Sequence, residues 1–467
     1  MDNPFIHLIK TNFGFYLFDV NKNTIQKISK EAYDYLQKQS ASEETEGVPD
    51  EILQLKQSGY LSTKRPEKIE MQETHLMHYY LSNRLEKLTL QVTQQCNFCC
   101  SYCPYTLGDD THYHSHNPNH MTWETAKKAI DFFALRTRDT PMINIGFYGG
   151  EPLLEYNLIK KCISYASKVF EGRNITYSMT TNGSLLTPEN VKFLIDSGVS
   201  VTVSFDGPRE IQNKNRKSKA NGEGTFDTVT RKLTEIRDNE PGYYKKLSFN
   251  TVIDPANDSS CINEFFSCET YRDLSVSTPM VDPFNQRRLY YSDKFIDTYK
   301  LDTVAAMLAN AGLIEPTELS TIAFNTFNAI RWFKTGLSPK VGLPDTMGHS
   351  GPCKPGVMRL FVTYDGYFYP CEKVDDSSCL MKIGSVDTGF DEERIKQIYN
   401  LFYKNDSKCK NCWNILHCNI CAKSVIFNDE VSLEMYEAAC RDACRNTDNN
   451  IKRIIAIQEA RERLKSS

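Results

Sequence analysis

The sequence predicts an α/β fold built on parallel strands, because strand-like and helix-like segments alternate along the middle of the chain. Amphipathic helical patterns separate short runs of β-branched and aromatic residues, and regular βα alternation favours a parallel sheet covered by helices. The expected strands lie near residues 88–93, 142–148, 175–179, 200–203, 246–253 and 274–278. The expected helices cover 122–137, 156–170, 189–197, 224–237 and 259–267.

Polar and glycine-rich clusters follow these strands at their carboxyl ends. The second, third and fourth strands lead into Gly-Gly-Glu-Pro at 149–152, Thr-Thr-Asn-Gly at 180–183 and Ser-Phe-Asp-Gly at 204–207. Taken singly, each cluster would be read as a turn or a strand end. Parallel β/α folds build their sites at this edge of the sheet. The shared placement therefore predicts one functional site.

Three cysteines follow the first strand with the spacing C-x3-C-x2-C, namely Cys96, Cys100 and Cys103. Three neighbouring thiolates suit an iron–sulfur cluster in which one iron has no protein ligand and is free to bind a small molecule. The spacing alone is weak support, because the chain holds 16 cysteines in 467 residues. Cys99 falls off the pattern and is expected to be a buried thiol.

Together, the triplet and the strand-end clusters resemble the radical S-adenosylmethionine (SAM) enzymes over about residues 85–300. The resemblance implies a partial (β/α)6 TIM-like barrel, with one [4Fe–4S] cluster on the three cysteines and SAM bound to its open iron. The cofactor-binding residues that it implies are Tyr102, Gly149, Gly150, Glu151, Thr181, Asn182, Ser204 and Arg216, with Asp206 as a further candidate.

A second cysteine group near the C-terminus resembles the SPASM extension of these enzymes, which carries two auxiliary [4Fe–4S] clusters. The resemblance implies that the first auxiliary cluster takes Cys353, Cys371 and Cys421. It implies that the second takes Cys409, Cys412 and Cys418, with Cys440 or Cys444 as the fourth ligand. In total, three clusters are expected.

Three alternatives stay open for this second group. Residues 354–360 contain no cysteine, so we infer an open iron on the first auxiliary cluster, unless Cys379 or Cys444 closes it. Two residues separate Cys418 from Cys421, where the family has three, which leaves these two assignments open. Four thiols spaced as C-x2-C-x5-C-x2-C from residue 409 would also form a zinc knuckle.

The N-terminal residues resemble the small winged-helix element with which peptide-modifying enzymes recognise a leader peptide. We expect a β-hairpin near 5–20, a helix capped by Ser29, a second helix from Asp50 to Gly59 and a short returning strand. In that family the leader is bound as an added strand. The alternatives are a structural cap or a DNA-binding winged helix, and the net charge of −4 disfavours DNA.

The predicted organisation has five parts: a recognition domain at 1–70, the barrel at 80–300, a bridging region at 301–345, a SPASM domain at 346–450 and a C-terminal helix at 451–467. The hydrophobic share of 40% is ample for the cores of such domains. No targeting signal and no apolar run of membrane-spanning length is evident, so a cytoplasmic location is expected.

The combined resemblance implies a radical SAM oxidoreductase that installs thioether crosslinks, from cysteine sulfur to carbon, in a ribosomally made precursor peptide. A 5′-deoxyadenosyl radical would start the reaction. The implied partners are a cysteine-containing precursor with a leader and a one-electron reductant of the flavodoxin or ferredoxin type, with no nucleic acid or membrane. The alternatives are a sulfatase-maturing enzyme that makes formylglycine, carbon–carbon peptide crosslinking, and a zinc-stabilised peptide-binding protein without enzymatic activity.

Overall fold

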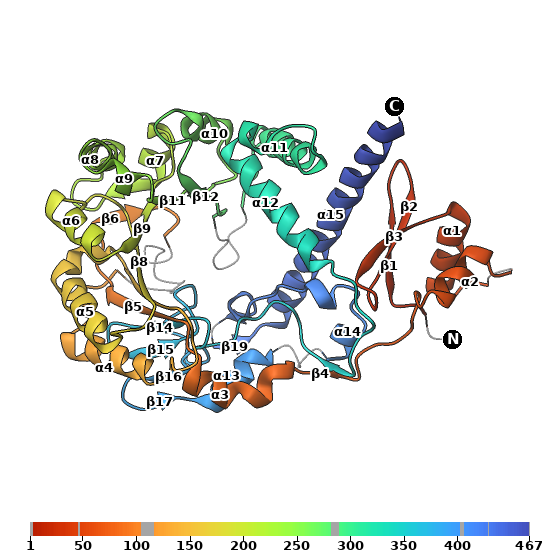
Figure 1. The fold of residues 1–467 in the computed structure, drawn as a ribbon, viewed down its shortest axis with the longest axis horizontal. Coiled ribbons are helices and arrows are strands. Elements are labelled where there is room, and N and C mark those ends of the chain that lie inside the picture. Colours follow the sequence, from red (N-terminus) through yellow and green to blue (C-terminus); the bar gives the residue numbers. More distant parts are fainter. Residues whose placement is uncertain are drawn as a thin grey trace.

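A curved sheet of ten strands forms the centre of the molecule in the computed structural model, in the order β12-β11-β9-β8-β7-β5-β14-β15-β16-β17 (Figure 1). The structure describes residues 3–44, 47–103, 116–281, 289–401, 406–427 and 429–466. Six strands of its first part are parallel to one another, which confirms the predicted α/β sheet. They are β5 (Lys87–Thr93), β7 (Ile143–Gly149), β8 (Ile175–Thr181), β9 (Val199–Ser204), β11 (Ser248–Asn250) and β12 (Ser275–Ser277).

The helices of the barrel cover the outer face of this sheet (Figure 1). The predicted ones are confirmed within a few residues, and local capping explains where two of them begin. Thr122 accepts a hydrogen bond from the backbone N–H of Thr125, and Thr187 forms a reciprocal capping box with Asn190. The helices are α4 (Trp123–Ala134), α5 (Tyr156–Val169), α6 (Pro188–Asp196), α7 (Arg209–Asn215), α8 (Phe226–Asn239), α9 (Pro241–Tyr244) and α10 (Ser260–Ser267).

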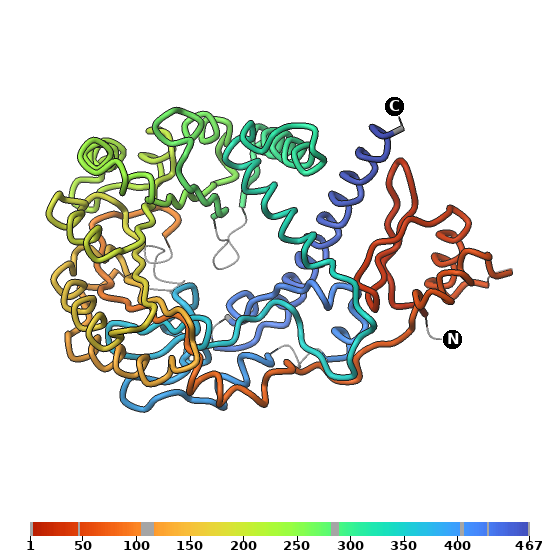
Figure 2. The backbone as a smooth tube through the Cα atoms, in the orientation of Figure 1, coloured from red at the N-terminus to blue at the C-terminus, as the bar shows by residue number. Residues whose placement is uncertain are grey.

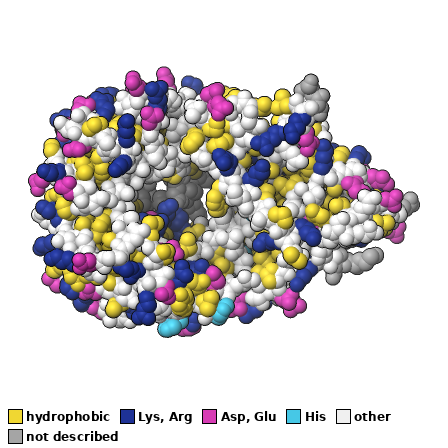
Figure 3. All heavy atoms as spheres, in the orientation of Figure 1, with side chains coloured by type: hydrophobic (Ala, Val, Ile, Leu, Met, Phe, Trp, Pro, Cys, Tyr) yellow, Lys and Arg dark blue, Asp and Glu magenta, His cyan; other side chains and the backbone are white. Residues whose placement is uncertain are grey.

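The inner face of the barrel is polar. Along β9 the valines 199, 201 and 203 are buried in the hydrophobic core, whereas Ser200, Thr202 and Ser204 alternate with them and keep some exposure. Since successive side chains of a strand point to opposite faces, the valines pack toward the helices and the hydroxyls face the interior. The molecule is hollowed at this interior in the space-filling view (Figure 3). The barrel therefore encloses a polar chamber.

The sheet continues from the barrel into the cysteine-rich C-terminal part. Strand β14 (Leu360–Val362) pairs in parallel with β5, and the antiparallel strands β15 (Tyr367–Tyr369), β16 (Gly384–Ser385) and β17 (Gly389–Phe390) follow. The two parts predicted as separate domains thus share one sheet. The pattern along the sequence did not reveal the β5–β14 pairing, because the partners lie so far apart in the chain.

The N-terminal part forms a three-stranded antiparallel sheet, β1 (Ile6–Lys10), β2 (Phe15–Asp19) and β3 (Thr24–Ile28), followed by α1 (Lys30–Ser40) and α2 (Asp50–Gln57). The prediction of a returning strand directly after the second helix is wrong. The third strand comes before α1, because Asn23, with φ of 55°, turns the chain back onto β2. The next strand after α2 is β4 (Lys68–Ile69), which pairs with β13 (Thr346–Met347).

A 34-residue helix, α15 (Leu433–Ser466), joins the C-terminal part to the N-terminal sheet (Figures 1 and 2). The predicted C-terminal helix at 451–467 covers only its second half, and its first half carries Cys440 and Cys444. It packs against α11 (Asp293–Ala311) and α12 (Thr321–Gly336), which occupy the predicted bridging region. The smaller helices are α3 (Met77–Asn83), α13 (Glu392–Tyr399) and α14 (Asp406–Lys410), and β18 (Ile426–Phe427) pairs with β19 (Glu430–Val431).

None of the helices in the described ranges is long and apolar enough to cross a membrane.

Candidate functional site

The first cysteine triplet lies directly after β5, at the carboxyl edge of the parallel strands. The segment is held by a small ribbon in which β6 (Phe98–Cys100) pairs with β10 (Arg216–Ser218), so that Arg216 stands opposite Cys100. Cys96, Cys100 and Cys103 are close enough for each charge to shift the pKa of its neighbours. Burial raises the pKa of both Cys96 and Cys100 to about 12, so a bound metal's positive charge would be needed to deprotonate these thiols.

Gly149 and Gly150 allow the end of β7 to contact the backbone that leads into the triplet. A Cβ atom on Gly149 would lie 2.1 Å from the Thr93 carbonyl oxygen, and one on Gly150 would lie 2.0 Å from the Gln95 carbonyl oxygen. Gly150 and Glu151 donate backbone hydrogen bonds to these same carbonyls. Only glycine, which has no Cβ atom, permits the two backbone segments to lie so close together. The two glycines therefore let the end of β7 lie directly against the segment that leads into the cysteine triplet.

The Glu151 carboxylate is fully buried and binds the next strand-end turn. It accepts hydrogen bonds from the Thr181 hydroxyl (2.7 Å), the Asn182 backbone N–H (2.7 Å) and the Leu153 backbone N–H (3.0 Å). Burial raises its pKa to about 7, although these three donors favour the charged form. In this structure Glu151 thus joins the ends of β7 and β8.

The turn at Asn182 is also bound to the cysteine segment. The Asn182 side-chain amide donates to the Asn97 side-chain oxygen at 2.8 Å and lies 3.9 Å from the Cys96 sulfur. Asn97 in turn donates to the Ser184 hydroxyl at 2.9 Å. An amide donor beside a cysteine sulfur stabilises the thiolate.

Tyr102, Asp206 and Arg216 form one buried cluster beside the triplet. The Tyr102 hydroxyl donates to Asp206 at 2.5 Å, and the Arg216 guanidinium donates to the other carboxylate oxygen at 3.0 Å. The guanidinium carbon lies 5.4 Å from the centre of the Tyr102 ring. Asp206 also accepts from the Val252 backbone N–H, which ties the cluster to the strand-end region after β11. Ser204 lies at the end of β9, opposite Asn250.

The residues at this edge fit a cluster with an organic cofactor. Three thiols converge there, and the Arg216 Nε is buried without a hydrogen-bond partner among the described residues. A guanidinium N–H left open in a buried site suits a carboxylate ligand.

A second set of three cysteines lies on the other side of the chamber. Cys353, Cys371 and Cys421 influence one another's pKa values, and burial raises the pKa of Cys371 to about 11. Beside them, Arg359 forms an ion pair with Glu372 at 2.5 Å. The structure brings this set together from β14–β15 and the segment before α15.

Tyr148, on β7, lies near cysteines of both sets. Both Cys103 and Cys371 are close enough to act on the pKa of its hydroxyl, which burial raises above its usual value. Its ring packs edge-on against Phe361, with centroids 6.4 Å apart. The two cysteine sets therefore both lie within electrostatic range of one side chain of β7.

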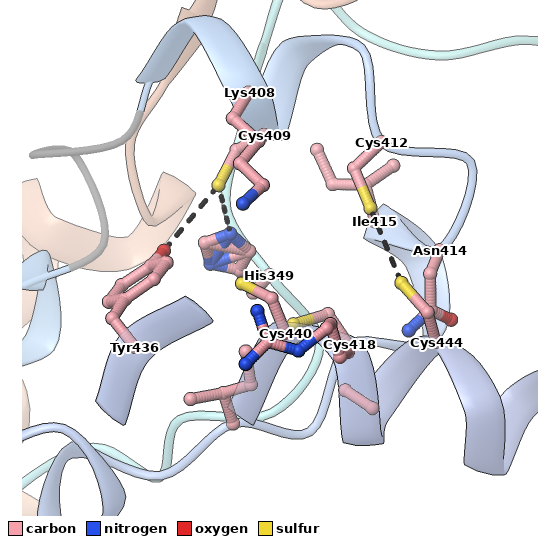
Figure 4. A pocket seen from close by; sticks show the side chains of 13 residues that line it. His349, Lys408, Cys409, Cys412, Asn414, Ile415, Cys418, Tyr436, Cys440 and Cys444 are labelled. Carbon is pink, nitrogen blue, oxygen red and sulfur yellow. Dashed lines mark hydrogen bonds between the residues drawn. The ribbon is translucent and has the colours of Figure 1, made fainter. Parts of the chain in front are cut away.

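Five further cysteines of the C-terminal part line a cavity of about 190 Å³ (Figure 4). Cys412 and Cys444 have sulfur atoms 4.0 Å apart, and the Cys409 sulfur lies 3.2 Å from the His349 Nε2 and 3.6 Å from the Tyr436 hydroxyl. Both candidates for the last ligand line this cavity. The cysteines concerned are Cys409, Cys412, Cys418, Cys440 and Cys444.

The structure divides the four thiols of the alternative zinc knuckle between the two cysteine groups of the C-terminal part. Cys421 lies with Cys353 and Cys371, whereas the other three knuckle thiols line the cavity of Figure 4. Of the two thiols considered for closing the first auxiliary set, Cys444 lies in the cavity and Cys379 lies beside Asp429.

Two neighbours of the site carry no sequence signal: His349 and Tyr436 contact Cys409 from distant segments. His116, which belongs to a histidine-rich stretch better explained in the sequence as a loop than as a metal site, lies 3.7 Å from the Cys103 sulfur. The prediction of a buried Cys99 is wrong, since this thiol is exposed on the short β6 strand.

Residues 90–260 match the model of the radical SAM superfamily. The serine-type anaerobic sulfatase-maturating enzyme of Bacteroides thetaiotaomicron is 34% identical over 144 residues, which cover 30% of this chain and 34% of that protein. The cysteine-type anaerobic sulfatase-maturating enzyme of Clostridium novyi is 25% identical over 70% of this chain and 85% of its own. The chain spans between 34% and 46% of the length of the first curated relatives that it matches.

Among solved structures, native anSMEcpe with bound AdoMet and the Cp18Cys peptide is similar, with a TM-score of 0.57 and 20% identity. The match covers 80% of this chain and 99% of that chain. At this identity, the likeness shows a shared fold.

Proposed function

We propose, from the premise that this chain carries a radical SAM superfamily domain, that it is a peptide maturase that forms thioether crosslinks. The observation that carries the proposal is that Tyr148 lies within electrostatic range of both Cys103 and Cys371. Two cysteine sets that face one chamber would flank a single substrate residue. One set would serve the radical chemistry and the other would hold the substrate sulfur.

The triplet Cys96, Cys100 and Cys103 would hold the cluster that binds SAM. When bound, this pair of cofactors supplies the one-electron chemistry that removes a hydrogen atom from substrate carbon. The Arg216 guanidinium, fixed by Asp206, would bind the carboxylate of SAM through its open Nε. Glu151 would act as a positioning residue, because its carboxylate fixes the Thr181–Asn182 turn.

The set of Cys353, Cys371 and Cys421 would hold the first auxiliary cluster with one iron open. A substrate thiolate is a soft ligand that suits such an iron. Binding there would deprotonate the substrate cysteine and fix its sulfur in the chamber, which favours bond formation by positioning. The cavity of Figure 4 would hold the second auxiliary cluster, through which the surplus electron would leave.

The N-terminal sheet would bind the leader of the precursor. Strand β3 pairs only with β2 among the described residues, so its outer edge offers backbone groups to an added strand. Helices α1 and α2 follow β3 directly and would flank a leader bound at that edge.

Sulfatase maturation is the second candidate function. The relatives in Bacteroides and Clostridium carry that activity in their names, and the solved structure with the Cp18Cys peptide shares the fold. Such an enzyme would oxidise a cysteine or serine of its target to formylglycine.

The two candidates differ in the fate of the substrate sulfur. The purified protein would be reduced anaerobically with SAM and either a cysteine-containing precursor or a sulfatase-derived cysteine peptide. Thioether formation removes two hydrogen atoms, retains sulfur and blocks thiol alkylation, whereas formylglycine formation removes the sulfur and leaves an aldehyde. An aldehyde product would overturn the first candidate. Failure to form 5′-deoxyadenosine with either peptide would overturn both.

A further inference from the structure

Lys87 lies against the inner face of the barrel, at the start of β5. Lys87 is paired with Asn144, and the side chains two positions further along this part of the wall are small: Thr89 is paired with Gly146, and Gly146 with Ser178. A Cβ atom on Gly146 would lie 3.2 Å from the Lys87 Cε, 3.2 Å from the Ser178 Oγ and 3.4 Å from the Thr89 Oγ1. The lysine side chain therefore crosses the bare backbone of Gly146 beside two hydroxyl groups.

The Lys87 ammonium has no hydrogen-bond or ion-pair partner among the residues that the structure describes, although its side chain is largely withdrawn from water. Thr89 is only 4% exposed, and its hydroxyl oxygen likewise has no hydrogen-bond partner in the described ranges. Buried polar groups are nearly always paired. Two open groups side by side in a chamber wall indicate a missing ligand.

The charges around Lys87 show what kind of ligand is missing. Burial lowers the pKa of Lys87, Arg359 lowers it further, and Glu372 opposes them. Glu372 already pairs with Arg359 at 2.5 Å, so the three side chains Lys87, Arg359 and Glu372 together carry one positive charge in excess. An unpaired buried cation is costly, and an anion would relieve the cost.

The same arginine connects this place to the first auxiliary cysteine set. Arg359 lies within electrostatic range of Cys353 and Cys371 as well as of Lys87. An anionic group bound at Lys87 would therefore sit in the chamber close to the substrate sulfur.

We propose that Lys87 and Thr89 bind a carboxylate side chain of the substrate, an aspartate or glutamate close to the residue that is modified. The ammonium would donate to one carboxylate oxygen and the threonine hydroxyl to the other. The inference rests on the proposed function only in taking the substrate to be a peptide. It makes Lys87 a specificity-determining residue.

The first test uses synthetic cysteine peptides that carry one aspartate at successive distances from the cysteine, with a matched asparagine set. Binding is measured anaerobically without reductant, so that no turnover is needed. The best aspartate peptide should bind about tenfold more tightly than its asparagine counterpart, as a charge-assisted hydrogen bond predicts. Lys87→Gln should abolish this preference, so that the aspartate peptide binds no more tightly than its asparagine counterpart. A preference that persists in Lys87→Gln would overturn the proposal.

A second measurement needs no variant and no long peptide. Acylation of Lys87 in the wild-type holoprotein is followed by mass spectrometry with N-acetylaspartate amide or N-acetylasparagine amide present. The aspartate compound should protect Lys87, and the asparagine compound should not. Exposed Lys300 is the internal control, whose acylation should be the same with both. Equal acylation of Lys87 with both compounds would contradict the proposed carboxylate site. A failure to form 5′-deoxyadenosine would instead contradict only the proposed function.

Discussion

His7 stacks face to face on Trp413, with ring centroids 3.9 Å apart and ring planes within 5° of parallel. His7 belongs to the N-terminal sheet, and Trp413 is the chain neighbour of Cys412 and Asn414, which line the five-cysteine cavity. The His7 Nε2 also lies 2.8 Å from an Asp448 carboxylate oxygen on α15. The N-terminal sheet is thereby fixed both to a cavity loop and to the helix that carries Cys440 and Cys444.

The stack gives the first prediction. His7→Ala should lower the free energy of unfolding by about 1–2 kcal/mol, because one aromatic contact and one hydrogen bond are lost. Thermal denaturation measures the change. The control is Lys27→Ala, which removes a solvent-exposed ion pair with Glu462 between the same two elements and should change the melting temperature little. Equal effects of the two variants would contradict a role for the stack.

The cysteine sets give the second prediction. Three [4Fe–4S] clusters correspond to about twelve irons per chain, so replacing Cys96, Cys100 and Cys103 together by Ala should leave about eight. The variant should form no 5′-deoxyadenosine. Anaerobic iron and sulfide analysis with product chromatography checks both. Cys162→Ala, at a buried thiol within α5, is the matched control and should retain all the iron. Cofactor cleavage by the triple variant would refute the assignment.

Glu151→Gln gives the third prediction. Glutamine keeps the shape of the glutamate side chain, but one of its two terminal groups is an NH2 donor. This NH2 group would face the Thr181 hydroxyl or a backbone N–H, which are themselves donors. We expect a loss of about 1–3 kcal/mol of stability and weaker SAM binding, measured by urea denaturation and equilibrium dialysis. Glu155→Gln, a nearby carboxylate without a recorded hydrogen bond in the described residues, should have little effect on either.

The pKa of Glu151 gives the fourth prediction. Burial raises it from 4.5 in the unfolded chain to about 7 in the folded protein. Between pH 4.5 and 7 the Glu151 carboxyl is protonated in the folded protein and ionised in the unfolded chain. Its contribution to the free energy of unfolding is therefore complete below about pH 4.5. It is lost as the pH rises through about 7. The wild type should therefore lose about 3 kcal/mol more than Glu151→Gln over this window in urea titrations. Parallel pH profiles of the two proteins would contradict the raised pKa.

Gly150→Ala gives the fifth prediction. The new methyl group would meet the Gln95 carbonyl oxygen at 2.0 Å, and neither backbone segment moves without shifting the cysteine triplet. The cost should be about 3 kcal/mol, the upper range for overpacking, together with loss of iron from this cluster. Gly242→Ala is the control, because nothing lies within 4 Å of its added methyl group. Full iron content in Gly150→Ala would show that the close approach is not needed.

The sequence predicted the parallel core well, because its strands carry their own alternation of apolar and polar residues and the helices α4 and α6 carry their own caps. Strand β9 illustrates this: buried valines alternate with polar residues, which marks its length within one residue at each end. The strand-end clusters could likewise be predicted to meet, since parallel strands bring their carboxyl ends to one edge.

Contacts between distant segments could not be predicted in the same way. The β5–β14 pairing, the His349–Cys409 contact and the open Lys87 depend on how the chain folds back in space. Strand β3 was missed for a local reason, because polar Gln26 and Lys27 interrupt its apolar residues. Cofactor contact by Glu151 stays a prediction, and the link that its carboxylate makes between two strand ends is visible only in its buried hydrogen bonds.

The β5–β14 pairing has a consequence for how the protein is made. As the ribosome synthesises the chain from the N-terminus, β5 emerges early and β7 soon covers one of its edges. Its other edge stays unpaired until residues 360–362 leave the ribosome, and such an edge is a template for mispairing with other chains. Completion of the barrel is thus delayed until the cysteine-rich part has been synthesised. A chain terminated before β14 should aggregate rather than accumulate as a soluble barrel.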